Sequence, residues 1–80
     1  MNIKEAVVAR FREIMEMRQI TANELANISG VIPSSVYSML DSRRKEVSVN
    51  LIKKLCDGLN ITMGEFFSAK IFDELEQEIQ

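Results

Sequence analysis

A single glycine, Gly30, separates two short segments of helical apolar pattern in the stretch TANELANISGVIPSSVYSML, residues 21–40. Thr21 and Glu24 have the spacing of a capping box, in which both side chains accept hydrogen bonds from backbone N–H groups at the start of a helix. Gly30 can take the left-handed conformation that ends a helix abruptly. Pro33 suits the first turn of the next helix, where its missing N–H would have no partner. The sequence therefore predicts two helices of about eight to ten residues joined by a tight turn.

The apolar residues of the remaining chain also recur at helical spacing. A first helix is predicted over about residues 3–18. Residues 41–48, DSRRKEVS, lack an apolar period and are predicted to form an exposed loop before a fourth helix over about residues 49–58. A capping box at Thr62 and Glu65 begins a short fifth helix. Because no alternating strand pattern occurs, we predict an all-α domain of five helices with a short C-terminal helical extension.

Charge divides the chain into a body and a tail. Residues 1–70 hold all ten Lys and Arg residues and eight of the twelve acids, so the formal charge of −2 conceals a mildly basic body. The other four acids lie in residues 71–80, where Phe72, Leu75 and Ile79 would form one apolar stripe on a helix. This pattern predicts one small domain over residues 1–70 and an acidic amphipathic tail over residues 71–80.

The residue types argue against several classes of function. The chain has no histidine and a single cysteine, Cys56, which rules out an intrachain disulfide, a zinc site of Cys/His type and a His-based catalytic triad. We therefore predict no enzyme activity, no cofactor and no metal. No run approaches the roughly 18 apolar residues of a membrane span, and the charged N-terminus lacks the apolar region of a signal peptide. These features predict a cytoplasmic protein with no membrane partner and indicate no small-molecule substrate.

The spacing within residues 21–40 matches the packing needs of a helix-turn-helix. The small Ala26 suits the place where the two helices cross closely, and Gly30 suits the turn. The second helix can then bury one side and present the other to the major groove of DNA, while the first helix lies across the backbone. The residues predicted to make the buried contacts are Leu25, Val31, Val36 and Met39.

The stretch TANELANISGVIPSSVYSML, followed by VSVNLIKKLCDGLNITMGEFF, resembles the Cro/phage-repressor type of helix-turn-helix domain in the XRE family of transcriptional regulators. The resemblance covers residues 3–67. It implies the five-helix, lambda-repressor-like DNA-binding fold, with the third helix, about residues 33–41, in the major groove of double-stranded DNA. It also implies a repressor that binds a palindromic operator as a homodimer.

The resemblance assigns DNA contacts to two sets of residues. Bases would be read by Ser34, Tyr37 and Ser38 on the third helix, although serine hydroxyls discriminate weakly between bases. Phosphates would be contacted at the starts of the second and third helices and in the following loop, because helix N-termini and basic side chains attract anions. This phosphate set is Thr21, Asn23, Pro33, Ser35, Arg43, Arg44 and Lys45.

The chain departs from the family pattern at several positions. Members often have glutamine where this chain has Pro33, and Ser42 replaces the glycine that usually follows the third helix. An Arg–Glu pair that often links the first and third helices is replaced by Met15 and Leu40. Replacing a buried ion pair with apolar residues costs little stability, so we expect the fold to be kept.

Two alternatives remain open on these residues. Pro33 and the acidic total also suit a protein-binding module, antitoxin-like or anti-repressor, that keeps the fold but reads DNA weakly. The tail, residues 71–80, either docks on its own domain, against the first helix and Phe67, or pairs with the tail of a second subunit. Pairing is favoured, because a palindromic operator needs two recognition helices about 34 Å apart.

Overall fold

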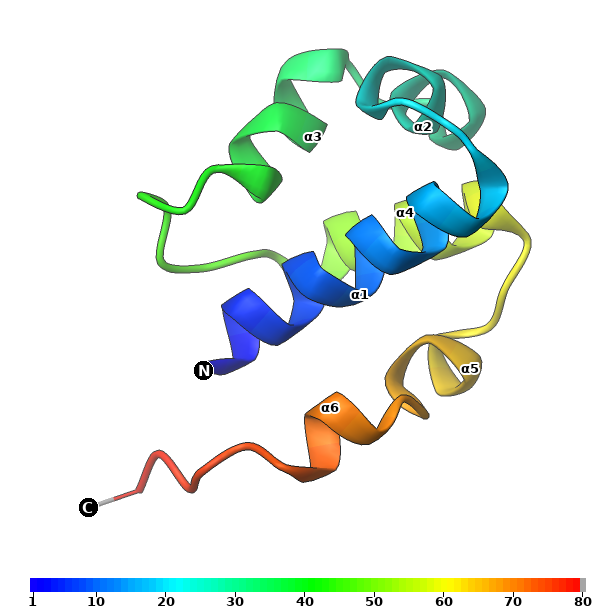
Figure 1. The fold of residues 1–80 in the computed structure, drawn as a ribbon. Coiled ribbons are helices and arrows are strands. Elements are labelled where there is room, and N and C mark those ends of the chain that lie inside the picture. The colour runs from blue at the N-terminus through cyan, green and yellow to red at the C-terminus, as the bar shows by residue number, and fades with distance from the viewer. Residues whose placement is uncertain (80) are drawn as a thin grey trace.

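The computed structural model describes residues 1–79, and helices are the only regular elements in that range (Figure 1). The all-α fold class is therefore confirmed, including the short C-terminal helical extension. None of the described helices is long and apolar enough to cross a membrane. The helices are α1 (Ile3–Arg18), α2 (Ala22–Ser29), α3 (Pro33–Leu40), α4 (Val49–Leu59), α5 (Met63–Phe67) and α6 (Lys70–Asp73).

The local signals in the sequence form the hydrogen bonds that start and end the helices. At α2, Glu24 N donates to Thr21 Oγ1 at 3.1 Å, and Thr21 N donates to Glu24 Oε1 at 2.8 Å, which completes the predicted capping box. Gly30 ends this helix with a φ of 69° and a ψ of 27°, in the left-handed region. Pro33 is the first residue of α3. The break predicted within residues 21–40 is therefore confirmed.

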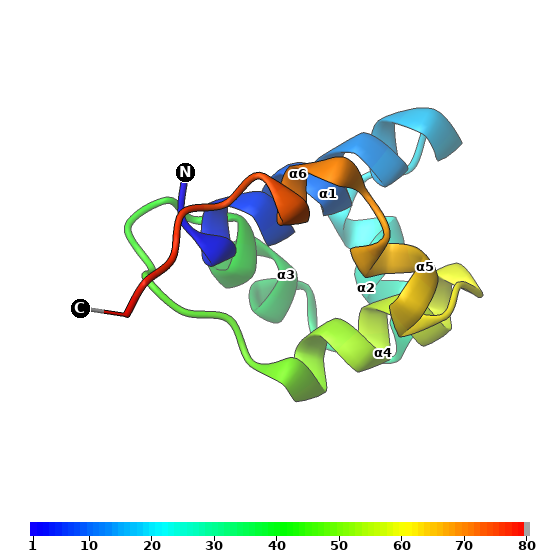
Figure 2. The same cartoon turned by 90° about the horizontal axis from the view of Figure 1, so that it is seen from below.

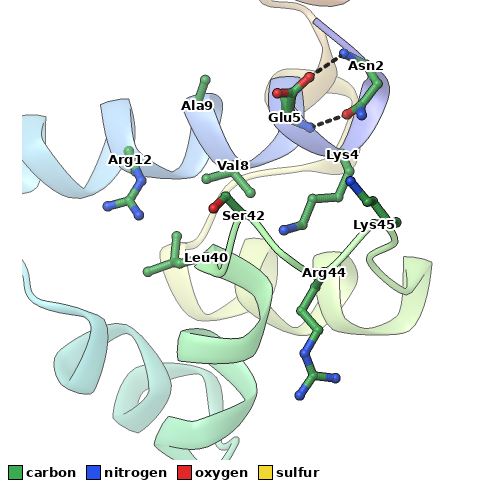
Figure 3. A pocket seen from close by; sticks show the side chains of 10 residues that line it. All are labelled: Asn2, Lys4, Glu5, Val8, Ala9, Arg12, Leu40, Ser42, Arg44 and Lys45. Carbon is green, nitrogen blue, oxygen red and sulfur yellow. Dashed lines mark hydrogen bonds between the residues drawn. The ribbon is translucent and has the colours of Figure 1, made fainter.

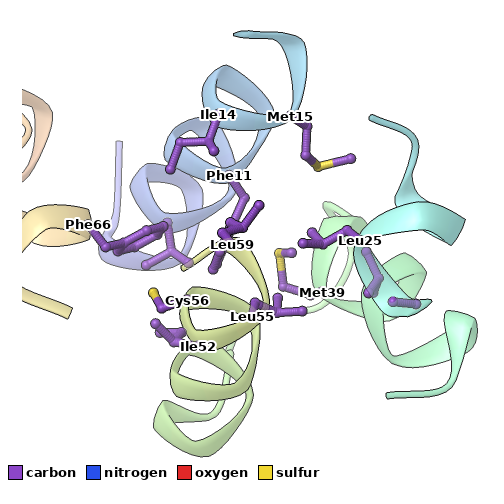
Figure 4. Packing of buried hydrophobic residues seen from close by; sticks show 13 residues of the cluster. Phe11, Ile14, Met15, Leu25, Met39, Ile52, Leu55, Cys56, Leu59 and Phe66 are labelled. Carbon is purple, nitrogen blue, oxygen red and sulfur yellow. The ribbon is translucent and has the colours of Figure 1, made fainter. Parts of the chain in front are cut away.

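The apolar sides of the first four helices meet in one core (Figure 4). Leu25, Ala26, Val36 and Met39 are buried there, as predicted for a helix-turn-helix, and Val31 is half-buried. Full burial of a large apolar side chain contributes about 1.5–3 kcal/mol. Because α2 packs against both α3 and α4, this burial holds α3 in a fixed orientation on the domain.

Aromatic packing joins the C-terminal helices to α1. The ring of Phe66 lies 4.4 Å from that of Phe11 and 4.9 Å from that of Phe67, measured between ring centroids. Arg10 of α1 also holds the end of α5, since its Nε donates to the carbonyl of Phe66 at 2.9 Å and its Nη2 donates to the carbonyl of Glu65 at 3.1 Å. A cationic side chain thus satisfies the carbonyl of Phe66 at the end of α5, while that of Glu65 also accepts hydrogen bonds from Ser68.

The C-terminal tail is less helical than its sequence pattern predicts. The helix α6 ends at Asp73, and residues 74–79 are not helical. The apolar stripe that Phe72, Leu75 and Ile79 would form on a helix is therefore not continued beyond Asp73, and residue 80 lies outside the described range. A helix of about ten residues is marginal without packing along its length, so the apolar period alone does not stabilise it.

The beginning of the tail docks on its own domain. The ring of Phe72 lies 4.8 Å from that of Phe67 and 5.8 Å from that of Phe66. The chain then passes the N-terminus of α1 (Figure 2). Leu75 is half-buried, whereas Ile79 is 81 % exposed. Apolar packing on the domain is therefore strongest in the first part of the tail, while Glu76 and Glu78 line grooves beside the start of α1.

The helices α2 and α4 approach each other closely at Ser29 and Gly58. A Cβ on Gly58 would lie 2.2 Å from Ser29 Oγ and 2.8 Å from Ser29 Cα. Ser29 Oγ is buried and has no hydrogen-bond partner among the described residues. The sequence pointed to Ala26 as the site of a close crossing, and the structure adds this second one, between α2 and α4. A glycine is required at position 58 because a side chain would collide with Ser29, not because of its backbone conformation.

The substitution Gly58→Ala should destabilise the domain by about 1–3 kcal/mol, because the added Cβ overpacks against the backbone of α2. That cost outweighs the roughly 1 kcal/mol by which alanine is favoured over glycine inside a helix. The matched control is Gly64→Ala in α5, where a Cβ would meet nothing nearer than Thr62 Oγ1 at 3.8 Å. Urea unfolding should show the control to be at least as stable as the wild type. Equal stability of the two variants would contradict the close contact.

Candidate nucleic-acid interface

The helices α2 and α3 and the turn at Gly30 form a helix-turn-helix (Figure 1). One side of α3 is buried in the core through Val36 and Met39. On the other side Ser34 and Tyr37 are exposed, with 53 % of Tyr37 accessible, and Ser38 is half-buried. Two of the three predicted base-reading residues therefore lie on the surface of α3, and the third lies at its edge.

A groove of about 380 Å³, here called the serine groove, separates α3 from the start of α4. Ser34, Ser35 and Ser38 line it from α3, and Asn50 and Lys54 line it from α4. Sequence reasoning did not include these two residues of α4 among the DNA contacts. The one signal that could have found them is their position in the first two turns of the helix after the basic loop. The structure thus brings an amide and an ammonium beside the serines of α3.

The N-termini of α2 and α3 differ in which polar groups are still available to bind an anion. At α2 the hydroxyl of Thr21 already accepts the hydrogen bond of the capping box, whereas Asn23 is exposed. At α3 no side chain caps the N-terminus, Pro33 has no N–H, and Ser35 N donates to the carbonyl of Ile32 at 3.0 Å. The partial positive charge of the α3 N-terminus is therefore uncapped by any side chain, which favours a nearby phosphate.

The three basic residues of the loop after α3 are not equivalent. Arg43 binds the carboxylate of Asp41, since Nε donates to Oδ1 at 3.1 Å, Nη2 donates to Oδ2 at 2.9 Å and the backbone N–H donates to Oδ1 at 2.9 Å. The side-chain hydrogen bonds from Arg43, followed by the backbone one, lower the pKa of Asp41 to about 2. The sequence prediction treated Arg43 as a free cation, but here it is already paired with a carboxylate.

Arg44 and Lys45 are exposed and form no ion pair within residues 1–79. The backbone N–H of Arg44 donates to the carbonyl of Asp41 at 3.0 Å, and Lys4 Nζ of α1 donates to the same carbonyl at 2.7 Å. Sequence reasoning missed Lys4, because a lysine is almost never fully buried. Asp41 therefore organises the start of the loop through its carbonyl as well as its carboxylate.

Met15 and Leu40 are the two positions at which the resemblance implied the loss of an Arg–Glu pair. Met15 is part of the buried core, and Leu40 is partly buried against it. Both positions are therefore used for hydrophobic packing in this chain.

Residues 10–70 match the model of the Cro/C1-type helix-turn-helix (HTH) DNA-binding domain. The chain therefore belongs to this family, which is non-catalytic, and membership implies that it binds DNA. Among solved structures, the crystal structure of prophage Lp1 protein 11 is similar, with a TM-score of 0.80 and 27 % sequence identity over 92 % of this chain and 97 % of that one. No curated protein matches the chain.

Replacing Arg43 with alanine should raise the pKa of Asp41 from about 2 toward its ordinary value of 3.8. The increase should be incomplete, because the backbone N–H of residue 43 still donates to the carboxylate. Since folding lowers this pKa, the ionised carboxylate stabilises the fold above about pH 4, and that contribution is lost as the pH falls through about 2. The measurement is a carbon-13 NMR titration of the carboxyl group. Arg44→Ala is the control and should leave the pKa nearly unchanged; a similar rise in both variants would contradict the pairing.

Proposed function

We propose that this protein is a sequence-directed regulator of transcription, a repressor, that places α3 in the major groove of double-stranded DNA. The observation that carries the proposal is the division of α3 into a buried side, with Val36 and Met39, and an exposed side, with Ser34 and Tyr37. A recognition helix needs both, one side to fix its orientation and the other to reach base edges. The segment Pro33–Leu40 also carries no acid that would repel phosphates.

Phosphate contacts should supply most of the affinity. Arg44 and Lys45 follow α3 in the chain, and Lys54 lies across the serine groove. Ser34 and Ser38 offer hydroxyls that can bond to several base edges, so they distinguish bases less well than arginine or asparagine would. We therefore expect strongly salt-dependent binding with a modest preference for the operator over other sequences. Repression requires only that the bound protein blocks access to the promoter.

We also propose that two copies bind a palindromic operator, because two-fold dimers place recognition helices about 34 Å apart on such sites. An apolar contact is available near the tail. Ile3 and Val49 are exposed and line a groove of about 500 Å³ between α1 and α4, together with Glu78. The neighbouring Ile79 is exposed as well. Pairing would bring Ile79 of one copy against this groove of the other and cover apolar surface on both.

A second candidate function is a protein-binding module that keeps the fold and reads DNA weakly. Apolar side chains at the turn and on α3 favour it, since Ile28 is 51 %, Ile32 is 66 % and Tyr37 is 53 % exposed. Large exposed apolar patches are typical of protein-interaction sites, whereas DNA interfaces are more polar and positively charged. The dependence of binding on salt separates the two candidates, because only phosphate contact releases counterions from DNA.

Arg44→Ala and Lys45→Ala should each weaken binding to every duplex sequence and reduce the salt slope by about one. Arg43→Ala should have a smaller effect, because Arg43 is bound to Asp41. Asp41→Asn should increase affinity for random duplex DNA, since it removes a negative charge and releases Arg43. Fluorescence anisotropy at several salt concentrations measures all four variants.

Two results of that experiment would count against the proposed function. Salt-independent binding of the wild type to random duplexes would favour the protein-binding module. A changed sequence preference with an unchanged slope in Arg44→Ala would mean that Arg44 reads bases instead of contacting phosphates.

Truncation after Asp73 should weaken association of two copies, because it removes Leu75 and Ile79 while it keeps Phe72 docked on the domain. Sedimentation should then show a monomer that binds a half-site normally and the full operator much more weakly. Met17→Ala, at the other end of α1, removes an equally exposed apolar side chain and should leave association unchanged. A full-length protein that stays monomeric at high micromolar concentration would refute the tail contact.

A further inference from the structure

A cavity of about 300 Å³ lies between α1 and the loop that follows α3 (Figure 3). One wall is a single side of α1, because Lys4, Val8 and Arg12 are four residues apart and project from the same helix face. Figure 3 shows Lys4 and Arg12 on either side of Val8. Leu40 and Ser42 line the cavity from the opposite side. The cavity therefore has an apolar middle with a cation at each end of its α1 wall.

Four cations but only one carboxylate line this cavity. The carboxylate belongs to Glu5 and already accepts a hydrogen bond from Asn2 N at 2.8 Å in the cap of α1. None of the four cations forms an ion pair in the part of the chain that the structure describes. Positive charge is thus in excess around a half-open pocket, which favours an anionic occupant. The cations are Lys4, Arg12, Arg44 and Lys45.

Lys4 is the cation of this set whose burial costs free energy. The residue is only 4 % exposed, and its Nζ donates one hydrogen bond, to the carbonyl of Asp41 at 2.7 Å. An ammonium group has three donors, and a buried charge is costly unless it is paired. Within residues 1–79 no carboxylate pairs with it. An anion in the cavity would supply the missing partner.

We propose that this cavity binds a small organic anion. A phosphate or carboxylate group meets Lys4 at one end of the α1 wall, and an apolar body the size of about one ring packs on Val8, Ala9 and Leu40. The charge of Arg12 at the other end of the wall adds to the attraction for the anion. The volume lies at the small end of the range for ligand pockets, roughly 300–1,000 Å³. A phosphate of duplex DNA is a poorer occupant, because the DNA backbone stays at the protein surface and Lys4 is buried.

Nitrogen-15 NMR titration with three probes tests the site in the absence of DNA. Phenyl phosphate carries both an anion and a ring, inorganic phosphate carries the anion alone, and benzyl alcohol carries the ring alone. Phenyl phosphate should saturate the protein and bind at least tenfold more tightly than either fragment at the same ionic strength. The largest shifts should fall on the amides of Val8, Ala9, Leu40 and Ser42.

Two variants and one control connect the binding to this cavity. Lys4→Met keeps much of the length of the side chain, removes its charge and should weaken binding of phenyl phosphate at least tenfold. Arg12→Gln changes an exposed residue that is not needed for folding, so it tests the site even where Lys4→Met fails to fold. Lys70→Met removes the same charge from an exposed position on α6 and should leave binding unchanged.

Three results would overturn the proposal. In the first, phenyl phosphate binds no more tightly than inorganic phosphate. In the second, Lys70→Met weakens binding as much as Arg12→Gln does. Either result would indicate a solvated basic surface only. In the third, phenyl phosphate does not bind and Lys4→Met lowers the salt slope of DNA binding by about one, which would assign the charge to DNA. Because the titration contains no DNA, failure of this site and failure of the proposed function are observed separately.

Discussion

The close packing of α2 on α4 is the constraint on which the proposed interface depends. Ser29 and Gly58 leave no space for a Cβ between these helices, so α2 and α4 pack closely at this point. The left-handed turn at Gly30 then sets where α3 begins, and burial of Val36 and Met39 sets its rotation about its own axis. The outward direction of Ser34 and Tyr37 therefore follows from apolar packing on the opposite side of α3. Packing on the buried sides of α2 and α3 thus determines which side chains α3 exposes.

Asp41 provides a second constraint, because it controls the loop that carries the basic residues. Its carbonyl accepts hydrogen bonds from Lys4 of α1 and from the backbone N–H of Arg44, and its carboxylate binds Arg43. Hydrogen bonds to charged groups are roughly twice as strong as neutral ones. The start of the loop is therefore held by Lys4 of α1 and by Arg43 within the loop. The loop thus presents Arg44 from an anchored position, although the segment has no regular secondary structure.

The features predicted correctly from the sequence depend on residues a few positions apart. The capping box of Thr21 and Glu24 and the turn at Gly30 are local, and the buried residues of α3 follow from helical periodicity. The features that were missed join distant parts of the chain. Lys4 and the carbonyl of Asp41 are 37 residues apart. The close contact of Gly58 is with Ser29, which belongs to another helix. No local pattern distinguishes such residues from an ordinary exposed lysine or an ordinary helical glycine.

The same distinction explains the mixed outcome for the site and the tail. The exposure of Ser34 and Tyr37 follows from the period of α3, whereas the pairing of Arg43 depends on which rotamers meet around Asp41. In the tail the apolar period is present, but the helix ends at Asp73 and Ile79 remains exposed. A helical period predicts which face would be buried, but it does not show whether anything covers that face.

The acidic total of the chain is a poor guide to the charge that DNA would encounter. At physiological ionic strength the Debye length is about 8 Å, so exposed charges act mainly on their own neighbourhood. Glu76 and Glu78 lie beside the N-terminus of α1, where they complement its partial positive charge, and α3 carries no acid. The loop after α3 and the far side of the serine groove carry cations instead. Glu78 of the tail shares a groove with Lys45 and Glu46 of that loop, but α3 itself carries no acid. A net charge of −2 is therefore compatible with exposed cations beside α3.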